Sequence, residues 1–307
     1  MNAPQRPALP PPKPRASGQP TALSGLRIVD FSHFIAGPMC TMILADLGAE
    51  VIKIENAARG DDFRGFKPHL GGESSPYLWT NRNKLGVALD LTSAAAREIA
   101  VDLIRSADVV VENFSKGVME KFGLGYEAMR QINPRLIYCS VSAYGRDGAM
   151  SERLGFDPVV QAETGFMSLN GFPDQEGVRT GPAVMDISTG MMGAVAVLAA
   201  LAARERTGVG QQVEVALYDT ATLMLGFHAM NYLATGVNPS RFGNRSADSV
   251  PPCFTRPGRG WPTMSSASLP HSLRASRSTP VSIPLSSQRA KREPTCRPHA
   301  PRSRHSI

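Results

Sequence analysis

The sequence predicts an α/β fold with a Rossmann-like parallel sheet. Short apolar runs rich in Val and Ile recur between residues 26 and 217, as expected for strands buried on both faces. Longer segments with helical spacing lie between them, so strands and helices alternate as in a parallel sheet. The expected strands are 26–31, 51–55, 87–91, 109–114, 136–141 and 212–217.

The first of these units has the order strand, helix, strand. Pro38 suits the first turn of a helix that runs through residues 42–47, and Gly48 stops that helix. The second strand ends in Glu55, where a nucleotide-binding fold often carries an acid. The turn offers only Gly37 where the G-x-G-x-x-G fingerprint needs three glycines, so the pattern favours the topology but not an NAD site.

The net charge of +7 is unevenly distributed along the 307 residues. Residues 253–307 hold ten Lys and Arg and one acid, whereas residues 1–252 hold 23 Lys and Arg against 25 Asp and Glu. Because the basic charge is confined to one segment, we infer no nucleic-acid partner. Hydrophobic residues make up 42% of the chain, which is enough for a sizeable core.

The cysteine spacing indicates neither a disulfide framework nor a metal site. Four cysteines without a C-x-x-C pair fit a reducing cytoplasm: Cys40, Cys139, Cys253 and Cys296. The N-terminus lacks the apolar region of a signal peptide. The longest apolar run, residues 191–203, is too short to span a bilayer, so we expect no membrane association.

The stretch from Arg179 to Ala221 is the centre of the sequence. It places Asp186 at the start of a helix that we expect to be buried on most sides. Free amides and the helix dipole favour a negative charge there, so we expect Asp186 to be ionised at neutral pH. It is either an N-cap that satisfies these amides or a positioned carboxylate that attacks a carbonyl or takes a proton. Asp157 has a similar ambiguity, as a second active carboxylate or as the cap of a helix around Val160.

Polar residues follow the ends of several expected strands. In an open α/β sheet these ends share one edge, where ligands bind. Each of the residues alone could belong to an ordinary solvated loop. Together with three basic side chains they predict a groove for an anionic, nucleotide-like ligand, formed by Glu55, Asn113, Ser142, Tyr144, Arg64, Lys84 and Lys121.

Four motifs follow one another along the chain. The first is LSGLRIVDFSHFIAGPMCTMILADLGAEVIKIE at Leu23–Glu55, and the second is ADVVVENFSKG at Ala107–Gly117. The third is GFDPVVQAETG at Gly155–Gly165, and the last is the Asp186 stretch through VGQQVEVALYDTA. In this order they resemble the family III CoA-transferases, which include formyl-CoA transferase and carnitine CoA-transferase. The resemblance implies that residues 23–252 form the large domain of that fold.

The resemblance also implies a mechanism and a site. The family's catalytic nucleophile corresponds to Asp186, which would carry CoA as a covalent aspartyl thioester. Asn113, Lys84 and Lys121 resemble positions that contact CoA, with Arg64, Tyr144 and Asp157 as further candidates. The implied partners are an acyl-CoA and an acceptor carboxylic acid, with no permanently bound cofactor and with a second copy of the chain in an interlocked homodimer.

Two residues depart from related patterns. Formyl-CoA transferase has glutamine where this chain has Ile35, so the resemblance does not extend to the handling of oxalate or formate. The α-methylacyl-CoA racemase branch has histidine where this chain has Phe156, which removes one of two proton-transfer groups. A racemase-like enzyme therefore ranks below a transferase.

Residues 253–307 depart from the family altogether. They are rich in Ser, Pro and Arg without a sustained apolar period, which predicts disorder, as does the Pro-rich composition of residues 1–22. The expected small domain is largely missing, through a frameshift or through a genuine basic tail. The alternative function is accordingly an inactive fragment that binds CoA, and we expect a chain of this kind to be poorly stable or inactive.

Overall fold

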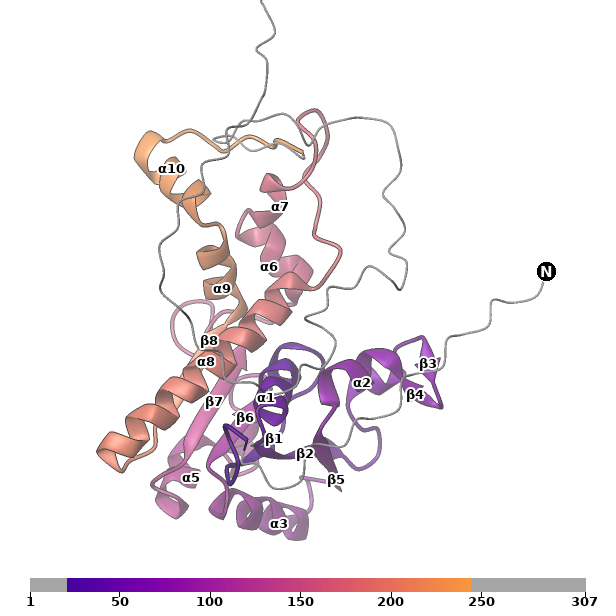
Figure 1. The fold of residues 1–307 in the computed structure, drawn as a ribbon, viewed down its shortest axis with the longest axis vertical. Helices are drawn as coiled ribbons and strands as arrows, with labels where there is room; N and C mark the ends of the chain where they lie inside the picture. Colours follow the sequence, from indigo (N-terminus) through magenta and orange to yellow (C-terminus); the bar gives the residue numbers. More distant parts are fainter. Residues whose placement is uncertain (1–20, 244–307) are drawn as a thin grey trace, which may run out of the picture. The chain divides into compact units, whose positions relative to one another are not determined.

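The computed structural model describes residues 21–243, which belong to one compact unit and include a six-stranded parallel sheet (Figure 1). The strand order is β5-β2-β1-β6-β7-β8. A short antiparallel pair, β3 (His69–Leu70) and β4 (Glu73–Ser74), lies outside this sheet. The predicted α/β fold is confirmed. The main strands are β1 (Arg27–Asp30), β2 (Glu50–Asn56), β5 (Lys84–Leu89), β6 (Val109–Glu112), β7 (Ile137–Ser142) and β8 (Gln212–Ala216).

The described helices, with the 3-10 turn η1, are α1 (Ala36–Asp46), η1 (Asp62–Gly65), α2 (Ser75–Asn81), α3 (Ala94–Arg105), α4 (Val118–Lys121), α5 (Tyr126–Ile132), α6 (Asp157–Glu163), α7 (Phe166–Leu169), α8 (Val184–Thr207), α9 (Leu217–Met224) and α10 (Phe227–Thr235). Of these, α1 and α8 cover one face of the sheet, and α3 and α5 cover the other.

The strand pattern divides the core into two layers. Successive side chains of a strand point to opposite faces, so Val109 and Val111 pack with α1 and α8, while Val110 packs with α3 and α5. All residues of β6 are buried, as expected for a central strand. The edge strand β8 instead alternates between exposed and less exposed positions, from Gln212 to Val215. The period-2 pattern of the sequence therefore decides which residues face each layer.

The helix α8 is the longest described helix and crosses the α1 side of the sheet (Figure 1). By length and composition alone, its 24 residues could cross a membrane. We expected the apolar run at residues 191–203 to be too short for this, and that expectation was wrong about length because the helix extends beyond the run at both ends. In the structure it packs on α1, β7 and β8. The expectation of burial on most sides was also too strong, because Met191 and Val195 are exposed.

The segment after β8 forms two successive helices, since α9 ends at Met224 and α10 begins at Phe227. Gly226 between them has φ +57° and ψ −133°, a backbone conformation that is accessible almost only to glycine. The predicted disorder of residues 1–22 and 253–307 concerns segments outside the described residues, apart from Thr21 and Ala22.

The contact between α1 and α8 depends on a glycine. A Cβ atom added to Gly190 would lie 2.7 Å from the carbonyl oxygen of Ala36 and 2.7 Å from Cβ of Met39. Gly190→Ala should therefore lower the free energy of unfolding by about 1–3 kcal/mol, measured by urea denaturation. The matched control is Gly86→Ala on the edge strand β5, where nothing lies within 4 Å of the added Cβ and stability should stay within about 1 kcal/mol. Equal effects of the two substitutions would contradict this packing.

Candidate active site

A cleft opens at the carboxyl edge of the sheet. Its larger part, with a volume of about 480 Å³, is lined by residues that follow β1, β6 and β7 and by the first turn of α8. An adjoining part of about 320 Å³ extends along the loops after β6 and β7. His33, Asn113, Ser142 and Phe156 line both parts. Parallel strands bring these loops together, as the sequence predicted for Asn113 and Ser142.

Asp186 lies in the first turn of α8 and lines the larger part of the cleft. The N-cap position is occupied by Ala183, so the N-cap interpretation of Asp186 was wrong. Within the described residues, no hydrogen bond or ion pair involves the Asp186 carboxylate. Burial, and then the nearby Asp157, raise the pKa of Asp186 to about 7. The expectation of full ionisation at neutral pH was therefore also wrong, because these two effects outweigh the helix dipole.

Asp157 holds the start of α8. Its Oδ2 accepts hydrogen bonds from the amides of Met185 at 2.6 Å and of Asp186 at 3.4 Å. Its Oδ1 accepts from Nε2 of Gln161 at 2.5 Å, and the Asp157 side chain is buried. The prediction that Asp157 caps the helix around Val160 was wrong, because Asp157 is the first residue of that helix, α6, whose N-cap is Phe156. Asp157 instead accepts backbone amides at the start of α8. This bond set satisfies α8 amides and leaves the Asp186 carboxylate free.

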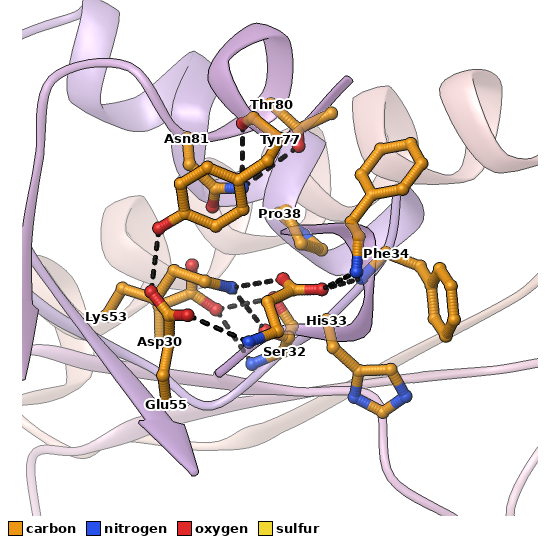
Figure 2. Close-up of polar contacts among 12 residues, drawn as sticks. Asp30, Ser32, His33, Phe34, Pro38, Lys53, Glu55, Tyr77, Thr80 and Asn81 are labelled. Atoms are coloured by element: carbon orange, nitrogen blue, oxygen red, sulfur yellow. Dashed lines mark hydrogen bonds and ion pairs between the residues drawn. The ribbon is translucent and has the colours of Figure 1, made fainter. Parts of the chain in front are cut away.

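The loop after β1 forms one wall of the cleft (Figure 2). The amide side chain of Asn113 accepts a hydrogen bond from the His33 backbone N–H and donates one to its carbonyl, both at 2.9 Å. Phe34 has φ +63°, an uncommon conformation outside glycine, and its N–H donates to Asp61 at 3.1 Å. Figure 2 shows the His33 ring pointing away from these polar contacts. Asn113, a predicted CoA contact, thus positions the loop as well as lining the cleft.

Two buried ion pairs lie beneath this loop. Lys84 pairs with Asp30 at 3.0 Å, and Lys53 pairs with Asp61 at 2.9 Å. Burial opposes ionisation of Asp30, but the two lysines hold the pKa of its carboxyl well below its usual value. Lys53 also donates to the Ser32 carbonyl at 2.6 Å. The loop is therefore tied to β1, β2 and β5 from below.

Lys84 does not fit its predicted role as a CoA contact. Its side chain is only 2% exposed, and its ammonium group already donates to Asp30, the Pro38 carbonyl and Asn81 within 3.0 Å. Burial lowers the pKa of Lys84 to about 8, although Asp30 opposes this shift. A phosphate could reach this amine only by displacing its partners. The prediction that Lys84 contacts CoA was therefore wrong. Its buried side chain instead supports the loop after β1.

Arg64 and Lys121 also lie apart from the cleft lining. Arg64 binds both carboxylate oxygens of Glu55 and stacks 3.8 Å from the ring centroid of Tyr77. Burial works against ionisation of Glu55, but Arg64 and Tyr77 lower its pKa to about 2. Lys121 is exposed at the end of α4. The predicted cluster of three cations in the groove is therefore not formed.

Tyr144 lines the smaller part of the cleft as predicted, and its hydroxyl donates to Glu163 at 2.7 Å. Three other lining residues were not among the candidates from sequence: His33, Phe34 and Arg146. The position of His33 just after a strand was a signal that could have identified it.

Among residues 21–243, no three His, Cys, Asp or Glu side chains are grouped so that they could hold a metal ion.

The buried ion pairs should dominate the stability of this region. Asp30→Ala leaves Lys84 buried without its carboxylate, so the free energy of unfolding should fall by about 3–5 kcal/mol. The matched control, Asp102→Ala, removes the exposed partner of Arg105 and should cost less than about 1 kcal/mol. Urea denaturation of both variants measures the difference. A small loss for Asp30→Ala would mean that the pair does not hold the loop.

Comparison with known proteins shows the family of the chain and agrees with the fold. The model of CoA-transferase family III matches residues 23–274, which extends past the expected boundary at Pro252. A succinate–glutarate CoA-transferase from Agrobacterium fabrum is 40% identical over 236 residues, which are 75% of this chain and 59% of that protein. An acetyl-CoA:oxalate CoA-transferase from Acetobacter aceti is 40% identical over 74% of this chain and 59% of its own length. The chain thus spans less than two thirds of the length of these relatives.

A solved structure gives the same result for the fold. The CAIB/BAIF family protein from Brucella suis superimposes with a TM-score of 0.71 at 42% identity. The match covers 74% of this chain and 61% of the other. With the family model matching most of the sequence and the fold in agreement, the chain belongs to CoA-transferase family III.

Proposed function

We propose that the protein is an acyl-CoA:carboxylate CoA-transferase that works through a covalent intermediate on Asp186. The observation that carries this proposal is the carboxylate of Asp186, which lines the cleft and makes no hydrogen bond or ion pair within residues 21–243. A nucleophile needs free lone pairs and a fixed position, and α8 with Asp157 supplies the position. The family and the names of the relatives support a CoA thioester as substrate.

The reaction proceeds in four exchanges at one carboxylate. The Asp186 carboxylate attacks the thioester carbonyl, giving an aspartyl–acyl anhydride and the CoA thiolate. The thiolate attacks the aspartyl carbonyl, which releases the donor acid and leaves an aspartyl–CoA thioester. The acceptor carboxylate attacks this thioester to form a second anhydride and releases the thiolate again. The thiolate then attacks the acceptor's acyl carbonyl, giving the new acyl-CoA and the free Asp186 carboxylate.

The smaller part of the cleft is the more suitable for CoA. Lys116 and Arg153 line it with side chains that are 40% and 49% exposed, and such basic side chains match the phosphates of CoA. Arg146 also lines it, but both oxygens of the buried Glu112 already hold its side chain. Asn113 fixes the shared wall through the His33 backbone. Lys121 on the neighbouring helix α4 stays a predicted phosphate contact. CoA would bind as a substrate, without a permanently bound cofactor.

We also propose that the active form is a homodimer in the cytoplasm. The resemblance to the interlocked family dimer supports the first part. The unpaired, buried thiols of Cys40 and Cys139 are compatible with a reducing compartment and support the second part.

Asp186→Asn should abolish transfer while leaving the fold intact. The amide keeps the shape of the side chain but cannot attack a thioester, so the enzyme–CoA adduct should disappear from mass spectra after incubation with acyl-CoA. Asp102→Asn, an exposed substitution on α3, is the matched control and should keep the adduct.

Two outcomes would count against this proposal. An adduct that persists in Asp186→Asn would place the nucleophile elsewhere. Binding of CoA without any adduct in the unsubstituted chain would instead indicate a CoA-binding fragment without transferase activity.

The rate should depend on pH through Asp186. Its pKa is raised to about 7, and only the ionised form attacks, so the reactive fraction should rise about tenfold between pH 6 and pH 8. Asp157→Asn removes a like charge and should move the midpoint of kcat/KM to lower pH, whereas Asp102→Asn should not. A profile that is flat from pH 6 to pH 8 would show that the ionisation of Asp186 does not limit the rate.

A further inference from the structure

The larger part of the cleft, around Asp186, is mostly apolar. Its polar side chains are His33, Asn113, Ser142 and Asp186, and among the described residues no Lys or Arg lines it. The remaining side chains form a hydrocarbon surface with Phe34, Ile35, Ala36, Phe63, Phe66, Val141, Ala143, Phe156 and Leu217. The volume of about 480 Å³ lies in the ~300–1,000 Å³ range that is usual for small-molecule sites.

The aromatic wall of this part is rigidly built. The rings of Phe63 and Phe66 are 5.1 Å apart, and each lies 6.0 Å from the ring of Phe34. One oxygen of Asp61 accepts hydrogen bonds from the backbone amides of both Phe34 and Phe63. The wall is thus fixed before any ligand arrives. Large apolar rings remain exposed in this part of the cleft, because Phe66 is 49% exposed and Phe156, which also lines it, is 65% exposed.

The charges in this part of the cleft are unfavourable to a second carboxylate. Asp186 lines it, and Asp157 lies behind the start of α8. Burial already raises the pKa of Asp186, so an ionised carboxylate is poorly solvated here. Burial also lowers the pKa of His33, so its ring is neutral and does not replace a cation. A buried charge without a partner is costly.

The basic residues of the smaller part already have acidic partners. Arg146 binds both oxygens of Glu112 at 2.7 and 2.9 Å. Arg153 pairs with Glu163, and Lys116 pairs with Glu152 at 3.3 Å. In the proposed function the two more exposed cations, Lys116 and Arg153, face the phosphates of CoA. The distal carboxylate of a dicarboxylic acyl group would therefore find no free cation beside Asp186 within residues 21–243.

We infer that the acyl subsite beside Asp186 accepts an uncharged aliphatic or aromatic acyl group, with Phe156 as a residue that determines this preference. The inference rests on the proposed function and deepens it by naming the substrate class. An uncharged acyl group differs from the dicarboxylates that appear in the names of the Agrobacterium and Acetobacter relatives. The matching chemistry is a monocarboxylic acid whose hydrocarbon part packs against Phe34, Phe66 and Phe156.

The test compares acyl groups of similar shape on the full chain. Isothermal titration calorimetry is run with CoA, with glutaryl-CoA, with 5-methylhexanoyl-CoA, in which an isopropyl group replaces the distal carboxylate, and with 3-phenylpropanoyl-CoA. We expect both uncharged esters to bind at least tenfold more tightly than glutaryl-CoA. Phe156→Arg should reverse the order by adding a cation to the cleft. Phe227→Arg, a substitution of another exposed ring that does not line the cleft, should leave the order unchanged.

The outcomes separate this inference from the proposed function. If CoA binds and glutaryl-CoA binds as tightly as the uncharged esters, the acyl inference is wrong and the transferase proposal stands. If the chain is folded by circular dichroism but binds neither CoA nor any ester, both are wrong. A reversal that also occurs in Phe227→Arg would show a general charge effect and would remove Phe156 from its assigned role.

Discussion

The cleft depends on the two buried ion pairs beneath the loop after β1. Asp30–Lys84 and Lys53–Asp61 connect that loop to three parallel strands through side chains that are almost completely buried. Isolated buried charges would be costly, but here nearly every charged group has its hydrogen-bond partners. Such a network accepts few alternative arrangements. It fixes the unusual backbone of Phe34, and the aromatic wall follows from that position.

Asp157 and Asp186 show how two neighbouring carboxylates acquire different roles from their surroundings. Asp157 accepts two backbone amides and a glutamine side chain, so it acts as the anchor of α8. Asp186 has no such donor among residues 21–243 and lines the cleft instead. Burial and the Asp157 charge raise the pKa of Asp186 into the neutral range, where protonated and ionised forms coexist. A helix start therefore does not by itself make a carboxylate an ionised cap.

The two parts of the cleft differ in chemistry although they share a wall. Basic side chains line the part along the loops after β6 and β7, and phenylalanines line the part beside Asp186. A CoA thioester has the same division, with charged phosphates at one end and an acyl group at the other. The thioester carbonyl would lie at the junction, where Asn113 and Ser142 line both parts. This correspondence links the fold to the proposed chemistry.

The sequence by itself determined the sheet, the edge that carries the site and the place of Asp186 at the start of α8. These features depend on local periodicity and on the rule that parallel strands end at one edge, so the sequence could place Asn113, Ser142 and Tyr144 at the edge where they line the cleft. Only the tertiary structure decided where the charged side chains point. Lys84 is buried in an ion pair with Asp30, which lies 54 residues earlier in the sequence. Asp157 accepts an amide at the start of a helix 28 residues later. Burial and partners at such separations leave no periodic pattern in the sequence, and they set both the pKa of Asp186 and the lining of the cleft.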